Sequence, residues 1–161
     1  MAERTANTGE IMSNDYDYHL VVLGNPKAQG RPKGKVISGH VHIYDPSESR
    51  KAKKSLALIV QEYAPAKLLI CPLAIKMEFY FPYRQGDYGT GRNAGVLKTS
   101  VPLWHTVKPD VDNCVKLALD AMTGIFFHSD SIISKLEVIK QYSERPRTEI
   151  FIKVLKNNKE I

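Results

Sequence analysis

Apolar and polar residues alternate most regularly between positions 73 and 81 of the chain. The apolar positions of this run are Leu73, Ile75, Met77, Phe79 and Phe81. A period of two predicts a β-strand with one face on the core. A second buried strand is predicted at residues 19–23, and a small hairpin is predicted where Ser38 and Gly39 separate two short apolar runs. Two further alternating runs, 132–142 and 148–155, predict an antiparallel hairpin near the end of the chain.

Two other segments repeat their apolar residues with the helical period. The first is predicted to start with Asp45 as its N-cap, Pro46 at the first helical position and Glu48 completing a capping-box arrangement. The second is predicted to span residues 111–122 and to end at Gly124. The predicted core stripes are Ala52, Leu56, Ile59, Val60 and Tyr63 in the first helix, and Val111, Val115, Ala118, Leu119 and Met122 in the second.

This order of elements predicts an α+β fold, with a single layer of mixed or largely antiparallel sheet and two main helices packed on it. Residues 1–17 are polar and predict a disordered N-terminal arm, so a single folded domain is expected at residues 18–161. The glycine-rich segment 83–107 is too long for an ordinary connection and predicts a functional or mobile loop.

The chain has 161 residues and is 43% hydrophobic, which suffices for one domain with its own core. It has no apolar run long enough to cross a membrane and no apolar leader, so we expect a cytoplasmic protein without a membrane partner. Cys71 and Cys114 lie far apart in apolar surroundings and predict small core residues, not a disulfide.

The net charge is +6, and residues 1–17 are acidic, so the surplus of cations lies in the domain. Such a surplus favours a polyanionic partner such as nucleic acid. Lys27, Arg31, Lys33 and Lys35 are predicted to share one loop, where they could contact several phosphates. A basic loop that is merely solvated fits the same pattern.

Carboxylates gather around the second predicted helix. Asp110 and Asp112 stand two residues apart, so inside a regular helix they would lie on different faces. If Asp110 precedes the helix, a bend at Pro109 can bring both carboxylates to one side. Together with Asp130 they would form an all-oxygen site suited to Mg²⁺ or Mn²⁺.

A purely structural arrangement fits the same carboxylates. In it Asp110 caps the helix, Asp112 complements the helix dipole, and Lys116 pairs with Asp112 or Asp120 one turn away. A calcium loop of the EF-hand type is excluded, because its fifth, sixth and twelfth positions lack the required residues. The residues alone leave the metal site and the structural arrangement open.

The string KPDVDNCVKLALDAMTG at residues 108–124, followed by HSDSII at residues 128–133, resembles the signature of the RusA family of Holliday-junction resolvases. The earlier segment PKAQGRP, residues 26–32, is similar to members from phage and prophage genomes. The order of predicted elements agrees over residues 18–155. This resemblance implies a RusA-like fold and a Mg²⁺-dependent endodeoxyribonuclease that resolves four-way DNA junctions by paired symmetric nicks.

Carried over residue by residue, the resemblance assigns metal binding and catalysis to Asp110, Asp112 and Asp130, and an essential cationic role to Lys116. Ser129 stands where a typical member has a second acid. Mn²⁺ is expected to substitute for Mg²⁺, and a homodimer is implied because two symmetric cuts need two sites. The other expected site residues are Asn113 and Asp120, which would orient the carboxylates or metal-bound water, and Lys27, Arg31, Lys33, Lys35 and Lys108, which would contact DNA.

Two rival functions remain open at this point: a non-catalytic nucleic-acid-binding protein on the same fold, and a nuclease selective for flaps or forks. The intact set of clustered acids argues against the first rival. The chain has no phosphate-binding glycine loop, nucleophile motif or zinc ribbon, so no small-molecule organic cofactor is expected. His105 and His128 flank the second predicted helix, where they could touch phosphate or be ordinary polar loop residues.

Overall fold

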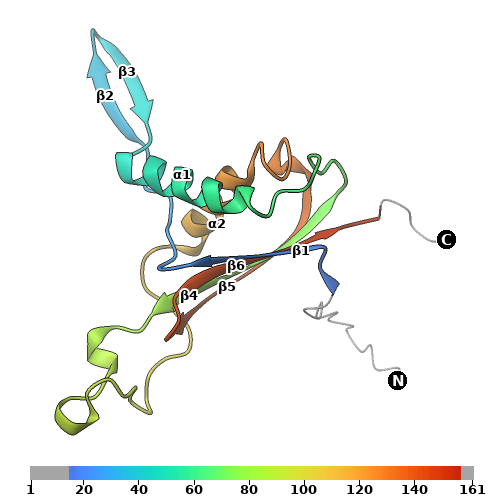
Figure 1. Cartoon of the computed structure of the whole chain (residues 1–161). Coiled ribbons are helices and arrows are strands. Elements are labelled where there is room, and N and C mark those ends of the chain that lie inside the picture. The colour runs from blue at the N-terminus through green and yellow to red at the C-terminus, as the bar shows by residue number, and fades with distance from the viewer. Residues whose placement is uncertain (1–14, 157–161) are drawn as a thin grey trace, which may run out of the picture.

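The computed structural model describes residues 15–156, and its elements form an α+β fold, as predicted. A four-stranded sheet carries two helices on one face, and a two-stranded hairpin projects away from it (Figure 1). The helices are α1 (Ser47–Gln61) and α2 (Val111–Met122), with the short 3-10 helices η2 (Gln85–Asp87), η3 (Gly91–Asn93) and η4 (Asp130–Ile132). The strands are β1 (Tyr18–Leu23), β2 (Lys33–Ile37), β3 (His40–Tyr44), β4 (Leu73–Pro82), β5 (Ile133–Ser143) and β6 (Arg147–Val154).

Strand β4 occupies the interior of the four-stranded sheet, whose order is β1-β6-β4-β5. It pairs in parallel with β5 and antiparallel with β6, so the sheet is mixed. The predicted alternation is confirmed, because Leu73, Ile75, Met77 and Phe79 are all buried. The predicted antiparallel hairpin of the last two strands is wrong: β4 lies between β5 and β6 and binds both. An apolar strand gains more burial with a neighbour on each edge than at the margin of the sheet.

The predicted small hairpin is confirmed as β2 and β3, which form a sheet of their own. Ser38 and Gly39 both have positive φ, as a two-residue turn that matches the strand twist requires. The predicted basic loop is shorter than expected, because Lys33 and Lys35 belong to β2. Only Lys27 and Arg31 remain in the connection that follows β1.

Helix α1 begins two residues after the predicted cap. Pro46, not Asp45, is its N-cap, and the cap makes no side-chain hydrogen bond. Proline fixes a φ that is compatible with helix entry, so it can stand at this boundary without a capping side chain. Of the predicted stripe, Val60 is fully buried, while Tyr63 lies beyond the helix and is 38% exposed.

Helix α2 has the predicted bounds, but its buried face differs from the predicted stripe. The buried residues are Cys114, Leu117, Ala118, Ala121 and Met122, which face the sheet and α1. Val111 is 43% exposed, and Val115 and Leu119 are only partly buried. The helix therefore carries two apolar stripes: one is buried in the core, and Val115 and Leu119 of the other pack against the core while staying partly exposed.

The sheet face away from the helices carries charged pairs in place of a second core. Lys76 contacts Glu78 at 2.9 Å, and Arg147 contacts Glu149 at 2.6 Å. The Arg147 guanidinium also lies 3.7 Å from the ring centre of Tyr80, a cation–π contact across β4 and β6. The helix-covered face is thus the only one that can form the apolar core within residues 15–156.

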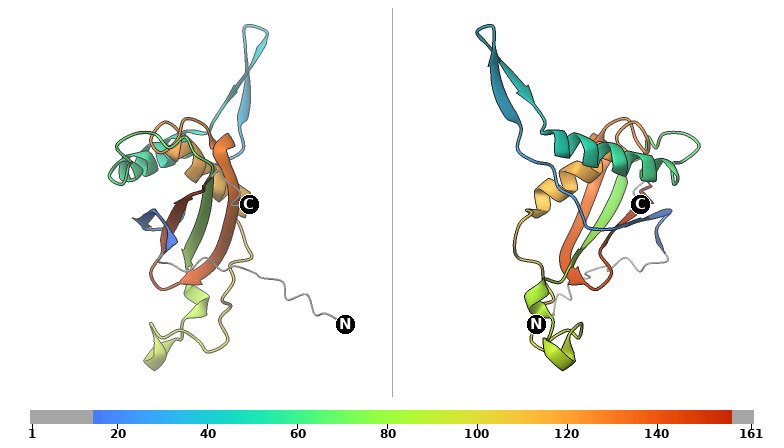
Figure 2. Two further views of the ribbon diagram at one scale, coloured as in Figure 1. Left: turned by 90° about the vertical axis from the view of Figure 1, so that its right-hand side faces the viewer. Right: turned by 60° about the vertical axis from the view of Figure 1, so that its left-hand side comes forward.

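Segment 83–107 projects from the end of β4 and contains η2 and η3 (Figure 2). Its last part returns along the outer edge of β5, where Trp104 forms an antiparallel bridge with Gln141. The backbone N–H of Tyr142 donates to the carbonyl of Leu103 at 2.9 Å. The predicted long loop is therefore anchored to the sheet at the end that leads into α2.

Neither cysteine is bridged, as predicted, but only Cys114 is a core residue; Cys71 is exposed, which corrects that expectation. Of the predicted N-terminal arm, residues 1–14 lie outside the described residues, as do residues 157–161. Asp17 lies beside β6, where its carboxylate accepts a hydrogen bond from the N–H of Val154 at 2.6 Å. Between residues 15 and 156 no helix is long and apolar enough to cross a membrane.

Candidate functional site

A surface pocket of about 550 Å³ lies between α2, η4 and β5. Its charged lining comprises Asp112, Lys116, Asp120 and Asp130. Its apolar lining comprises Val111, Val115, Leu119, Leu136 and Val138. The second apolar stripe of α2 therefore faces this pocket, with four of the sequence-predicted site residues around it.

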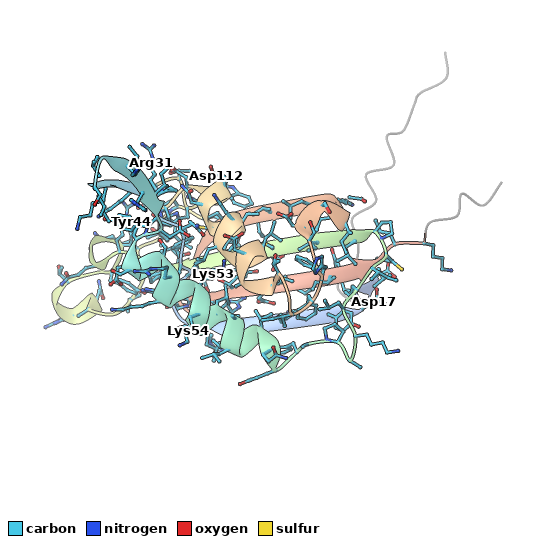
Figure 3. All side chains as sticks on the ribbon, turned by 90° about the horizontal axis from the view of Figure 1, so that it is seen from above. Asp17, Arg31, Tyr44, Lys53, Lys54 and Asp112 are labelled. Atoms are coloured by element: carbon cyan, nitrogen blue, oxygen red, sulfur yellow. The ribbon has the colours of Figure 1, made fainter. Side chains whose placement is uncertain are left out.

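The spacing along α2 explains why three of these charges share the pocket. Asp112, Lys116 and Asp120 follow one another at intervals of four residues, which places them along one side of a helix. Asp112 lies in the first turn, where the exposed N–H groups of the helix favour a negative charge. Figure 3 shows Asp112 at one end of α2, on the same end of the molecule as Arg31.

Asp110 is the N-cap of α2, immediately before the helix, as expected from its sequence. Its carbonyl accepts the first helical hydrogen bond from the N–H of Cys114 at 3.3 Å, but its side chain makes no capping bond. The residue is exposed, and it does not line the pocket. The Asp110 carboxylate is therefore held next to the pocket without a structural task at the cap.

Asp130 enters the pocket from the opposite side, as the first residue of η4. The turn before it is fixed by Ser129, whose hydroxyl accepts a hydrogen bond from the N–H of Ser131 at 3.2 Å. Buried Phe126 and Phe127 anchor the connection from α2, and the N–H of Leu69 donates to the Phe126 carbonyl at 2.7 Å. Ser129 thus caps the turn that carries Asp130.

The ion pairs of the structural alternative are not formed. Among the described residues, Lys116 makes no salt bridge, and Asp120 instead contacts Lys53 of α1 at 3.8 Å. Within that range Asp112 and Asp130 have no cationic partner either. Two carboxylates and one ammonium group therefore line a common pocket without ion-pair partners in the part of the chain that the structure describes.

The three predicted metal ligands are not brought together as one cluster. Across residues 15–156, no three carboxylate, imidazole or thiolate groups lie close enough to form a metal site. Asp112 and Asp130 share the pocket, and Asp110 stands at its margin. The donor chemistry nevertheless suits a hard cation, because every acidic group here offers carboxylate oxygens and none is engaged in an ion pair except Asp120.

Lys140 on β5 is a site residue that the sequence did not single out. Its ammonium group donates to the carbonyl of Val107 at 2.7 Å and to the carbonyl of Pro109 at 2.6 Å. These carbonyls flank the cis peptide bond between Lys108 and Pro109, directly before Asp110. Lys140 therefore ties the entrance of α2 to the sheet. In the sequence, Lys140 is marked only by its position: it follows Leu136 and Val138 at intervals of two, so it lies on the same face of the strand as these apolar residues.

His105 is a structural residue, not part of the pocket. It is 7% exposed and stacks on Phe81 with 4.0 Å between ring centres. Burial lowers the pKa of His105 below its usual value, and the nearby Lys140 lowers this pKa further. Burial also raises the pKa of the Cys114 thiol to about 11, so this thiol stays protonated and unreactive at neutral pH.

Three of the five predicted DNA-contacting cations belong to segments next to the entrance of α2, whereas Lys33 and Lys35 lie on the β2–β3 hairpin. The backbone N–H of Gln29 donates to the carbonyl of Asn113 at 2.9 Å, which docks the segment between β1 and β2 on the first turn of α2. Exposed Lys27 and Arg31 flank this contact in sequence, and Lys108 precedes the helix. Asn113 is only partly buried, and its backbone carbonyl, not its side chain, makes the described contact.

A second cavity of about 640 Å³ lies between α1 and the segment that follows β1. Its lining is mostly apolar and includes Leu56, Ile59 and Leu117. Glu48 is its one acidic residue within the described part of the chain. The chemistry predicted from the carboxylates therefore belongs to the pocket between α2 and β5.

Two similarities to known proteins extend over most of the chain. Residues 24–153 match the family model described as endodeoxyribonuclease RusA, a range that includes the pocket and the cations around α2. A Bacillus subtilis (strain 168) relative, the uncharacterized protein YqaN, is 35% identical over 134 residues, which cover 83% of this chain and 94% of the relative.

Proposed function

Because the chain belongs to the RusA family of endodeoxyribonucleases, we propose that it resolves four-way DNA junctions by Mg²⁺-dependent hydrolysis of phosphodiester bonds. The observation that carries this proposal is the pocket between α2 and β5, which Asp112, Lys116 and Asp130 line without ion-pair partners in the described chain. Exposed carboxylates and an ammonium group without ion-pair partners are available to bind a hard cation and a phosphate, which favours a role in binding or catalysis.

Asp112 and Asp130 would hold the metal ion from two sides of the pocket, with Asp110 as a third acidic group at its margin. When bound, Mg²⁺ would activate water and offset the negative charge of the phosphate, and Mn²⁺ would substitute because it prefers the same oxygen ligands. Both carboxylates are exposed, so a phosphodiester can approach them from solvent.

Lys116 would stabilise the negative charge that develops on the phosphate. It lies one helical turn after Asp112 on the same pocket, and it has no salt bridge among the described residues. Asp120 is held by Lys53 at 3.8 Å, so it is suited to orient its neighbours and less suited to bind the ion directly. Asn113 follows Asp112 and would serve the same orienting purpose through its amide.

The cations around the entrance of α2 would contact the phosphates of the DNA arms. Lys27, Arg31, Lys33, Lys35 and Lys108 are all exposed. Hydrogen bonds of Gln29 to α2 and of Gly30 to α1 fix the segment between Lys27 and Arg31 relative to the carboxylates, and Lys33 and Lys35 continue from it on the β2–β3 hairpin. Such contacts fix the register of the DNA and carry no sequence information.

A homodimer would place two such pockets on one junction and would allow paired nicks in opposing strands. Sedimentation equilibrium of the full chain tests this part of the proposal directly. A monomer at micromolar concentration that retains full junction-cleaving activity would contradict it.

The experiment that tests the function compares a synthetic four-way junction with a linear duplex, each with and without Mg²⁺. We expect symmetric nicks in the junction only, and only with the metal ion. Binding of the junction without any cleavage would favour a non-catalytic DNA-binding protein. Equal cleavage of flaps or forks would favour a nuclease of broader structure selectivity.

A further inference from the structure

The β2–β3 hairpin is an arm that extends from the body of the protein. All ten of its residues are exposed, and it forms a sheet separate from the main one. Figures 1 and 2 show it projecting from the side of the molecule that carries the helices. A lone two-stranded hairpin is marginally stable in water, and its unpaired strand edges can aggregate. A binding role would explain why such a hairpin is present.

The two faces of this arm differ in chemistry. Residues directly opposite each other on antiparallel strands share a face, and successive pairs alternate between faces. One face carries the pairs Lys33–Tyr44, Lys35–His42 and Ile37–His40. The other face carries the pairs Gly34–Ile43 and Val36–Val41. The arm is thus a ribbon with one face that carries two lysines, here called the cationic face, and one purely apolar face.

The apolar face is fully open to solvent. Val36 is 66% exposed, Val41 is 70% exposed and Ile43 is 75% exposed. Exposed β-branched residues in adjacent positions form a contiguous patch of the kind that marks a binding surface.

The charge of the arm favours a polyanion as its partner, which under the proposed function is DNA. From residue 31 to residue 44 the chain contains Arg31, Lys33 and Lys35 and no acidic residue. A second copy of this basic arm would be repelled, whereas a polyanion would be attracted. The arm also begins beside the candidate site, because the N–H of Gly30 donates to the Ser49 hydroxyl at 2.7 Å and the N–H of Gln29 donates to the Asn113 carbonyl at 2.9 Å.

We propose, building on the proposed function, that the arm recognises the branch point of the junction: its cationic face holds phosphates while Val36, Val41 and Ile43 cover base pairs that have lost a stacking neighbour. Apolar side chains that insert at a DNA step stabilise unstacked bases in this way. A linear duplex offers phosphates to the cationic face but no unstacked base pair to the apolar one. The arm would therefore give preference for branched over linear DNA.

The test uses the triple variant Val36→Thr, Val41→Thr, Ile43→Thr. Threonine keeps the β-branched shape that suits a strand and removes apolar character. Affinity for a synthetic four-way junction and for a linear duplex is measured in Ca²⁺, which keeps the DNA intact. Ile70→Thr, at an 84% exposed position outside the arm, is the matched control.

We expect the triple variant to lose about tenfold in junction affinity, and to bind the duplex like the wild type. The control should keep both affinities. The variant Lys33→Gln, Lys35→Gln should lose affinity for both DNA forms alike, because phosphates are present in both. An unchanged junction preference in a folded triple variant would overturn the inference, as would an equal loss on junction and duplex.

A second readout does not depend on any variant. A 2-aminopurine base at the branch should brighten when the wild-type protein binds, and the same base in the middle of an arm should not. Equal signals at both positions would contradict the inference. If sedimentation shows that the triple variant no longer associates with itself, a second copy covers the apolar face and the inference is wrong.

The experiments distinguish an error in the proposed role of the arm from an error in the proposed function. A wild-type protein that neither prefers nor cleaves the junction in Mg²⁺ would refute the function itself. A wild-type protein that does both, with a triple variant that retains the preference, would refute only the role of the arm.

Discussion

Replacement of Lys140 by methionine tests how the entrance of α2 is held to the sheet. The lysine donates two charge-assisted hydrogen bonds, at 2.7 Å to the Val107 carbonyl and at 2.6 Å to the Pro109 carbonyl. The second bond is partly buried and the first is exposed, so they should contribute about 1.5–2 and about 0.5–1 kcal/mol. Methionine retains most of the alkyl stem near Phe81 and removes only the donor.

The free energy of unfolding should therefore fall by about 2–3 kcal/mol, which corresponds to about 5–10 °C in Tm for a domain of this size. Urea unfolding measures the first quantity and calorimetry measures the second. Lys135→Met is the matched control, because Lys135 lies on the same strand, is exposed, and makes no side-chain hydrogen bond or salt bridge within residues 15–156.

Junction cleavage by Lys140→Met should also slow, because the segment that carries Asp110 is no longer fixed to β5. Restoring a donor of similar length, as in Lys140→Arg, should recover part of the rate and of the stability. If Lys140→Met and Lys135→Met unfold at the same urea concentration with the same slope, the described anchor contributes nothing and the reasoning fails.

Three further predictions concern charge and burial. The double variant Arg31→Ala, Lys33→Ala should make the slope of log K against log salt less negative by roughly 2 in Ca²⁺, and an unchanged slope would show that DNA binds elsewhere. Burial lowers the pKa of His105 below 6.5, so below that pH the unfolded chain binds more protons than the folded chain. The free energy of unfolding in urea should therefore be constant above pH 6.5 and should fall as the pH drops below that value. His105→Phe should remove this fall. A fall that persists in the variant would contradict its assignment to His105. Native protein should react with a thiol reagent at exposed Cys71 only, with Cys114 reacting after unfolding; two fast thiols in the native state would refute the burial of Cys114.

Local periodicity predicted the elements of this fold well. The bounds of α2 were correct to the residue, and the alternation of β4 was correct, because both patterns express burial of one face by neighbouring residues. The pairing of β5 with β4 could not be predicted in the same way. Strand order depends on contacts between residues far apart in sequence, and the short connection before β6 is equally compatible with a hairpin.

The sequence predicted those residues of the candidate site that lie on one continuous segment, residues 108–133. Asp112, Lys116 and Asp120 follow from helical spacing, and Asp130 from the short link after α2. Lys140 was missed because its acceptors are backbone carbonyls more than thirty residues away, which leave no pattern of side chains. The position of Asp110 outside the pocket lining also depends on the backbone at the cap, which residue spacing does not define.

The most direct test of the central claim is the single-turnover cleavage of a synthetic four-way junction in Mg²⁺ by three variants, each with a carboxylate replaced by its amide. They are Asp110→Asn, Asp112→Asn and Asp130→Asn, and Ser129→Ala is the control beside Asp130. We predict that each amide variant loses cleavage while junction binding is kept or strengthened, since each loses a metal ligand and a repulsive charge. The control should cleave at close to the wild-type rate. Wild-type cleavage by two of the three amide variants would contradict the assignment of this pocket as the active site.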